Sequence, residues 1–237
     1  MVSFSFVPGE PGRYVAMPHR SIFPIAVTLI APMLGCNAGQ QNIEPTELTD
    51  KSEFIEWIEQ LDSDLDREYT SYNLDDDGEF IYVDLQAAQV TNKDLSRLVR
   101  MNYLEHLNIS GNEITDGGLI HIAELTRLKH LDIGFNFISD DGLQHLRTLT
   151  NLESLLLNGL DDEDQLTDKG IRHLLPLSRL KELRLNSAQI TDASIETLLR
   201  FRNLKNLDVS WTNISDAGIE RLSEGLPDCD IERDSGA

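Results

Sequence analysis

The sequence predicts an α/β solenoid, in which short units of one strand and one helix stack along a single axis. Six units align, beginning at Phe80, Leu104, Leu128, Leu152, Leu180 and Leu204. Five of these units contain 24 residues, and the unit from Leu152 contains 28. Within each unit, apolar residues first recur two apart and then three or four apart, which is the change from a strand to a helix. Such a small unit cannot bury its apolar face alone, so successive units must stack.

The amino terminus contains an apolar run, IFPIAVTLIAPML at residues 22–34, which is too short to span a bilayer comfortably as a helix. His19 and Arg20 precede the run, and its end overlaps the motif MLGC at residues 33–36. A basic start, a short apolar segment and a small residue before the cleavage point are typical of a secretory signal. The motif resembles the lipobox of bacterial lipoproteins, which usually begins with Leu rather than Met. This resemblance implies that Cys36 is lipidated and holds the mature protein to a membrane.

Two questions about this terminus stay open at the sequence level. Counted from Met17, the signal has nineteen residues with its charge in the usual place, whereas counting from Met1 adds a leader that fits no targeting pattern. Alternatively, residues 22–34 form a buried strand or helix of a cytosolic protein. Pro24 and Pro32 disfavour that alternative, because each removes a backbone donor.

Between the signal and the repeats, the sequence predicts a tether and a cap. Residues 37–49 are polar and lack a period, which favours a flexible linker. The stretch SEFIEWIEQL at 52–61 places its apolar residues on one broad helical face, which predicts a helix covering the first repeat. The predicted domains are a signal peptide at 1–35, a tether at 36–49, an N-terminal capping helix and turn at 50–79, the solenoid at 80–231 and a disordered tail at 232–237.

Two further positions in the unit carry local structure. A Thr or Ser followed by Asp precedes five of the helices, at Thr115-Asp116, Ser139-Asp140, Thr167-Asp168, Thr191-Asp192 and Ser215-Asp216. The hydroxyl can accept a bond from a first-turn amide, and the carboxylate meets the positive end of the helix dipole. Asn112 and Asn136 stand in the turn before the helix, where Ala88 and Ala188 occupy the same position in other units. Since alanine cannot bond the turn, we expect looser turns there.

The pattern LxxLxL…ITDxGLxxLxxL resembles the leucine-rich repeat family, in the 24-residue bacterial form related to the cysteine-containing type of F-box proteins. The resemblance covers residues 80–231, with six units in register. It implies a right-handed leucine-rich repeat solenoid, with a parallel sheet on the concave side and helices on the convex side. It also implies that the concave face is the surface used for binding.

Side chains that alternate with the strand leucines point away from the core onto this concave face. We expect a protein partner to contact Tyr82, His106, His130, Asp132, Phe135, Leu156, Arg184 and Trp211. Phe135 and Trp211 are placed on the rim, where exposed aromatic side chains suit a protein contact because such residues dominate interface energies. The alternative is a solvated sheet that binds nothing in particular.

Charge and motif content exclude other classes of function. The formal net charge of −21 repels nucleic acid and anionic lipid headgroups, so membrane contact is expected only through a lipid on Cys36. No metal or cofactor is expected, since His106 and His130 lack a third ligand and residues 73–84 only approximate an EF-hand loop. No catalytic motif is present, and Cys36 and Cys229 do not form a disulfide framework. We therefore do not expect an enzyme.

These observations predict a monomeric leucine-rich repeat module of the bacterial cell envelope, lipid-anchored, secreted and bound to a protein partner. One alternative is a cytosolic F-box-like substrate-recognition protein for a ubiquitin-ligase-type complex, although residues 37–79 contain no recognisable docking motif. Another is a cation-binding surface protein, because the loop at 73–84 and the acidic insertion at 161–164 are rich in Asp.

Overall fold

The computed structural model describes residues 4–5, 15–16, 45–65, 70–159, 166–186 and 188–234. The chain divides into two compact units, Met1–Ile43 and Glu44–Ala237. In the first unit, β1 (Phe4–Ser5) pairs antiparallel with β2 (Val15–Ala16). Cys36 and the apolar run before it lie outside the described residues. Among the helices that are described, none combines the length and the apolar character needed to cross a membrane.

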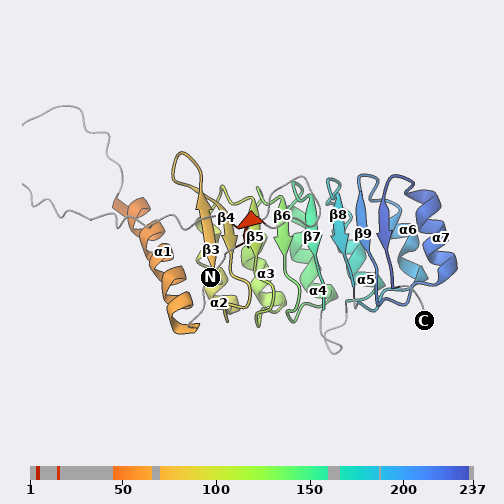
Figure 1. The fold of residues 1–237 in the computed structure, drawn as a ribbon, viewed down its shortest axis with the longest axis horizontal. Helices are drawn as coiled ribbons and strands as arrows, with labels where there is room; N and C mark the ends of the chain where they lie inside the picture. The colour runs from red at the N-terminus through yellow and green to blue at the C-terminus, as the bar shows by residue number, and fades with distance from the viewer. Residues whose placement is uncertain are drawn as a thin grey trace, which may run out of the picture. The chain divides into compact units, whose positions relative to one another are not determined.

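The second unit is built on one eight-stranded sheet, in which the strands follow one another in chain order (Figure 1). Strand β3 pairs antiparallel with β4, and every later pair is parallel. The strands are β3 (Ser71–Leu74), β4 (Phe80–Asp84), β5 (His106–Asn108), β6 (His130–Asp132), β7 (Ser154–Leu156), β8 (Glu182–Arg184), β9 (Asn206–Asp208) and β10 (Asp230–Glu232).

Helices cover one face of this sheet and leave the other face open (Figure 1). The α-helices are α1 (Pro45–Leu65), α2 (Asn92–Leu95), α3 (Asp116–Ile122), α4 (Asp140–Leu143), α5 (Asp168–Ile171), α6 (Ile195–Leu198) and α7 (Asp216–Gly225). Tighter 3-10 turns extend several of them, at η1 (Leu98–Arg100), η2 (Gln144–Thr148), η3 (Arg172–Leu174) and η4 (Asp192–Ser194). A unit of this length leaves room for only one or two helical turns, which is the range where 3-10 geometry is common.

The core confirms the predicted solenoid. Five strand leucines pair side by side across the parallel ladder, in the order Leu107, Leu131, Leu155, Leu183 and Leu207. None of them is more than 2% exposed. One continuous apolar cluster runs from α1 to the last repeat, because each unit buries its apolar face against the next. The fold class is therefore the α/β solenoid that the repeat predicted.

The Thr-Asp and Ser-Asp pairs cap the helices and also link neighbouring units. Four of the hydroxyls accept a bond from an amide in the first turn of their own helix, as predicted. The aspartates do more than face their own helix dipole. Four of the five carboxylates accept from the hydroxyl of the next unit at 2.6–2.7 Å, in the pairs Asp116–Ser139, Asp140–Thr167, Asp168–Thr191 and Asp192–Ser215. The carboxylates therefore join the units along the stack, a role that the sequence did not reveal.

The turn asparagines form a second ladder between units. Asn112 and Asn136 are buried, and each side-chain oxygen accepts from a backbone amide of the preceding unit at 3.0 Å. Ala88 and Ala188 lack this bond, as expected. In both cases the backbone amide of the alanine donates to the carbonyl three residues earlier, at 3.3 and 3.1 Å. The backbone thus satisfies the turn carbonyl that the asparagine side chain satisfies elsewhere.

The amino-terminal cap differs from the sequence prediction in its bounds. Helix α1 begins at Pro45, so residues 45–49 are helical and not part of the predicted tether. Phe54 and Ile58 of α1 are buried, and the Phe54 ring meets Phe80 of the first repeat edge-on at 5.1 Å. Strand β3 occupies a segment predicted only as a turn, because its mostly exposed, polar residues carry little alternation. At the other end, β10 includes Glu232, which was predicted to belong to the tail.

Candidate functional site

The open side of the sheet presents two rows of side chains, which together are called the sheet face below. The first row is Tyr82, His106, His130, Ser154, Glu182 and Asn206. The second row is Asp84, Asn108, Asp132, Leu156, Arg184 and Asp208. Six of the predicted partner-binding residues lie in these rows, and the parallel register places them on adjacent strands.

An aromatic run crosses the first three strands of the sheet face. The rings of His106 and His130 stack at 4.2 Å with an angle of 7° between their planes. The Tyr82 ring lies 6.0 Å from His106 and is tilted by 41°. Burial lowers the pKa of both histidines, and the neighbouring His130 lowers that of His106 further. Burial, together with the Asp84 carboxylate, raises the pKa of Tyr82 to about 12. At neutral pH the aromatic run is therefore uncharged.

Two carboxylates lie beside this run. Asp132 accepts from the Gly134 amide at 2.9 Å, and Asp84 accepts from the Gln86 amide at 3.0 Å. Asn108 makes the equivalent bond on the strand between them, also at 3.0 Å. Burial raises the pKa of both carboxyl groups despite these bonds. The side-chain amide oxygen of Asn108 accepts the same bond from a backbone amide, so this bond at the strand end does not require a carboxylate.

The centre of the sheet face combines an ion pair with an apolar side chain. The Arg184 guanidinium lies 2.9 Å from Glu182, and the Ser154 hydroxyl donates to the same carboxylate at 2.8 Å. Leu156 lies between Asp132 and Arg184 in the register of the second row. Sequence reasoning did not single out Glu182, although its place beside Arg184 in the strand could have indicated this bond.

The rim is formed by the turns that follow the strands. Phe135 is 63% exposed and Trp211 is 72% exposed, which makes them the two most exposed large apolar residues of the described chain. Their backbones are left-handed, with φ of 53° and 60°. Gly111 and Gly159 occupy the same turn position in other units, also with positive φ. Glycine is the residue that adopts this conformation without strain.

The two rim residues make different local contacts. The Phe135 ring packs over the next turn, since a Cβ atom added to Gly159 would lie 2.2 Å from its Cε1. The Trp211 backbone amide donates to Asp234 at 2.5 Å. Phe137, two residues after Phe135, is 40% exposed and extends the apolar rim. The sequence FNF could have indicated this second aromatic residue.

Other features lie away from the sheet face. A hollow of about 620 Å³ lies beside the contact between α1 and the first repeat and is lined by Lys51, Phe54, Phe80, Arg97 and Tyr103, among others. Across the described ranges, no three His, Cys, Asp or Glu side chains are grouped so that they could hold a metal ion. In the loop that approximates an EF-hand, Asp75 accepts from the amides of Asp77 and Glu79 and closes the β3–β4 turn.

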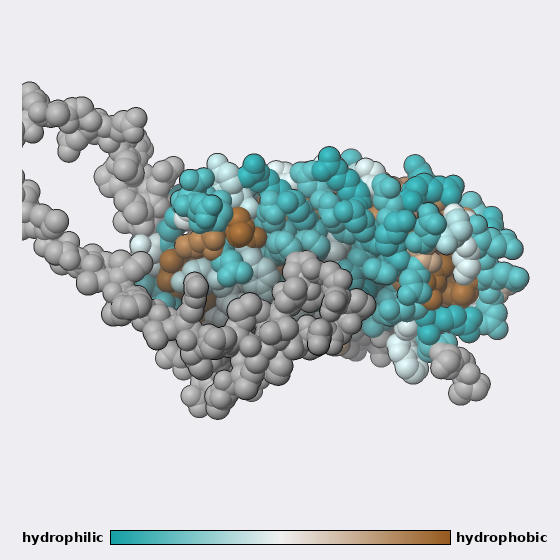
Figure 2. Space-filling model, turned by 45° about the horizontal axis from the view of Figure 1, so that its top comes forward, coloured by the Kyte–Doolittle hydropathy of each residue, from teal (hydrophilic) through white to brown (hydrophobic). Residues whose placement is uncertain are grey.

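The described part of the second unit that Figure 2 shows is largely hydrophilic. On the side shown in Figure 2, apolar patches lie near its two ends, with hydrophilic residues between them. Such a distribution is ordinary for a protein surface. The exposed aromatic residues of the rim are therefore a better indication of a binding site than these patches.

Comparison with known proteins supports the repeat assignment. Leucine-rich repeat family models match residues 104–145, as two copies, and residues 202–223. A comparison with curated proteins finds no match. The fold is thus an α/β leucine-rich repeat solenoid, as the sequence predicted.

Several solved structures with partial similarity come from bacteria. An internalin from Listeria monocytogenes is 32% identical over 60% of this chain and 38% of that chain, with a TM-score of 0.48. Internalin C2 from Listeria monocytogenes is 26% identical over 64% and 69% of the two chains, with a TM-score of 0.47. A leucine-rich repeat protein from Leptospira interrogans is 24% identical over 58% and 33%, with a TM-score of 0.44. The chain therefore spans well under half of the first of these structures.

Proposed function

We propose that the solenoid binds a protein partner through the sheet face and its rim. One observation carries this proposal: Phe135 and Trp211 are exposed aromatic residues in a left-handed turn position that suits glycine. A bulky residue in that conformation costs on the order of 1–2 kcal/mol. Folding gains little from side chains that remain mostly in water. Binding accounts for both features, because large aromatic residues supply much of the energy of protein interfaces.

The spacing of the two aromatic residues suits a single partner. Their turns follow β6 and β9, so three strand spacings of about 4.8 Å place them about 14 Å apart. Leu156 and Arg184 lie on the two strands between them. A partner that contacts both rim residues would also cover this centre, and a standard interface of about 800 Å² per partner is wide enough to do so.

The charge of the chain limits the kind of partner. The net charge of −21 disfavours nucleic acid, and two of the carboxyl groups, Asp84 and Asp132, lie on the sheet face beside neutral rings. A protein with a neutral or basic surface meets this face without like-charge repulsion. Binding, and not catalysis, is the function that this arrangement of side chains supports best.

Lipid anchoring is proposed from the sequence alone. The MLGC motif at 33–36 and the apolar run before it support a bacterial envelope protein whose mature chain begins at a lipidated Cys36. Cells expressing the protein would be labelled with a radioactive fatty acid, alongside cells expressing Cys36→Ser. We expect the label on the wild-type protein only. An unlabelled wild type, or an equally labelled variant, would contradict the anchor.

The binding proposal is tested by capture from envelope extracts of the source bacterium. In the test variant, Phe135→Gly and Trp211→Gly are combined, because the fold already carries glycine at this turn position. A matched control combines Ile120→Ala with Tyr103→Ala, which removes exposed apolar side chains away from the sheet face. We expect one captured protein to be retained by the wild type and the control and lost from the test variant. Equal capture by all three chains would refute the rim proposal.

A further inference from the structure

A hollow of about 360 Å³ lies where β7, β8 and β9 begin. It is lined by Glu153, Arg179, Lys181, Asn203 and Lys205. Three of these side chains are cationic and one is anionic, which leaves a local charge of +2 in a chain whose net charge is −21. A concentration of positive charge on so acidic a protein is not a consequence of its composition.

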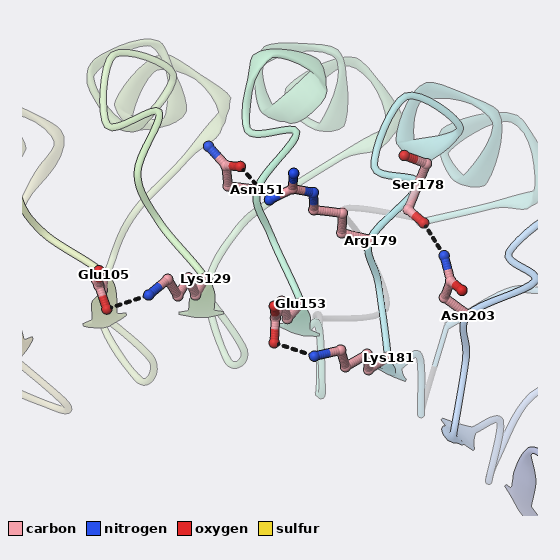
Figure 3. Close-up of polar contacts among 8 residues, drawn as sticks. All are labelled: Glu105, Lys129, Asn151, Glu153, Ser178, Arg179, Lys181 and Asn203. Atoms are coloured by element: carbon pink, nitrogen blue, oxygen red, sulfur yellow. Dashed lines mark hydrogen bonds and ion pairs between the residues drawn. The ribbon is translucent and has the colours of Figure 1, made fainter.

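Neighbouring units hold several of the lining side chains in place (Figure 3). The Lys181 ammonium lies 2.7 Å from Glu153, and Arg179 donates through Nη1 to Asn151 at 2.8 Å. The Asn203 amide donates to the Ser178 carbonyl at 2.8 Å. These contacts restrict the rotamers of the side chains, so a ligand would meet groups that are already oriented. The guanidinium has five N–H donors, of which the bond to Asn151 uses one.

Lys205 supplies the charge that the other contacts do not neutralise. Its ion pair with Asp228 is long, at 3.8 Å, and the Asp228 side chain is 86% exposed. An exposed pair of this kind is strongly screened by solvent and contributes little. Glu182, the next carboxylate along the sheet face, is already held by Arg184 at 2.9 Å. The lining groups therefore keep a net positive charge, which is +1 when Asp228 is counted with them.

The same positions two units earlier provide an internal comparison. They are occupied by Glu105, Arg127, Lys129, Asn151 and Glu153. Glu105 and Lys129 pair at 2.7 Å, as Glu153 and Lys181 do two units further along (Figure 3). The Arg127 guanidinium stacks on the Tyr103 ring at 4.6 Å. In this earlier set, Glu153 stands where Lys205 stands in the later one, so two cations and two carboxylates cancel. The exchange of one residue changes the local charge from zero to +2.

We propose that the hollow beside Lys205 is an oxyanion site that takes a phosphate group, either as free phosphate or as a phosphomonoester. A planar guanidinium and two ammonium groups are the donors that proteins use for phosphate oxygens. The net positive charge of the lining groups attracts a phosphate anion. The site lies at the edge of the sheet and does not depend on the partner proposed for the rim.

The experiment is a calorimetric titration of the full chain with inorganic phosphate, and separately with glycerol phosphate, at constant low ionic strength. Lys205→Glu converts the site into the neutral arrangement that the fold already contains two units earlier. Lys129→Glu changes the net charge by the same amount but lies in the neutral set. We expect saturable binding by the wild type and by Lys129→Glu, and a loss of at least about tenfold in affinity for Lys205→Glu.

The two ligands distinguish the two sources of phosphate. Tighter binding of glycerol phosphate would identify an ester as the ligand, and equal or weaker binding would identify the free ion. If Lys205→Glu proves poorly folded by circular dichroism, Lys205→Ala replaces it, with a smaller expected loss. The absence of saturable binding of either ligand by the wild type would overturn the proposal. An equal loss of affinity in Lys129→Glu would also overturn the proposal, because the loss would then reflect the net charge of the protein and not the hollow beside Lys205.

Discussion

Replacing Asn136 by alanine should be among the most destabilising single changes in the turns of this solenoid. Its side chain is 2% exposed, and its oxygen accepts from the Ile114 amide at 3.0 Å. Its amide donates to the carbonyls of Ile109, Ile133 and Gly134 at 2.9, 3.0 and 3.1 Å. In Asn136→Ala, Ile109 keeps a bond from Asn112 and Gly134 keeps one from a backbone amide. The Ile114 amide loses its partner, and the Ile133 carbonyl exchanges its side-chain donor for the backbone amide of residue 136, as the equivalent carbonyls do at Ala88 and Ala188.

The magnitude follows from the number of buried groups left without a bond. The unpaired Ile114 amide costs about 1–2 kcal/mol, and the exchange at the Ile133 carbonyl costs about 0.5–1 kcal/mol, which gives a loss of about 1.5–3 kcal/mol. Asn112 offers the matched comparison, because each carbonyl that it binds also accepts a second donor. In Asn112→Ala, only the Val90 amide loses its partner, which gives about 1–2 kcal/mol. The loss in Asn136→Ala should therefore exceed the loss in Asn112→Ala by roughly 0.5–1 kcal/mol.

The assay is equilibrium unfolding in urea, followed by far-ultraviolet circular dichroism, for the wild type and both variants. The free energy of unfolding should decrease in the order wild type, Asn112→Ala, Asn136→Ala. An equal or larger loss in Asn112→Ala would refute the reasoning from unpaired groups. So would a loss below about 0.5 kcal/mol in Asn136→Ala, since surface substitutions alone produce changes of that size.

Three further predictions concern charged groups. Asp140→Ala removes the carboxylate that joins two units, so thermal unfolding should show a loss of roughly 2 kcal/mol. Asp132→Asn should stabilise the protein by roughly 0.5 kcal/mol at neutral pH, because the raised pKa of the Asp132 carboxyl group means that its ionisation opposes folding. Urea unfolding should show that this gain disappears in acid, where the wild-type carboxyl group is protonated. The pKa values of His106 and His130 are lowered in the folded chain, so the unfolded chain binds protons first as the pH falls. The free energy of unfolding should therefore decrease below about pH 6.5. Urea unfolding across this pH range should show a smaller decrease for the double variant His106→Asn/His130→Asn.

The sequence predicted the core and its stacking because every unit has apolar residues at the same positions, and these must be buried. A leucine that is buried in one unit occupies the same position in the next, so the pairing of Leu107 with Leu131 follows from the repeat register alone. The bounds of the cap were harder to predict. Strand β3 is short and mostly exposed, and its pairing with β4 depends on a turn without a strong apolar signal.

The candidate site was predictable in position but not in its internal contacts. Strand alternation identified the residues of the sheet face, and the repeat register placed them in rows. Nothing in the spacing revealed that the rings of His106 and His130 stack, because side-chain rotamers decide that contact. The left-handed backbone of Phe135 was also hidden, although Gly111 and Gly159 at the same position could have indicated it. Inter-unit bonds of the aspartates follow from three-dimensional stacking and have no counterpart in local propensity.

Site-specific photocrosslinking in living cells tests the central claim, that the rim of the sheet face contacts a protein partner. A photoreactive phenylalanine analogue would replace Phe135, and in a second strain Ile120 on helix α3, whose side chain is also exposed. We predict a discrete crosslinked protein adduct from position 135 and none from position 120. The same pattern of adducts from both positions, or no adduct from position 135, would contradict the claim.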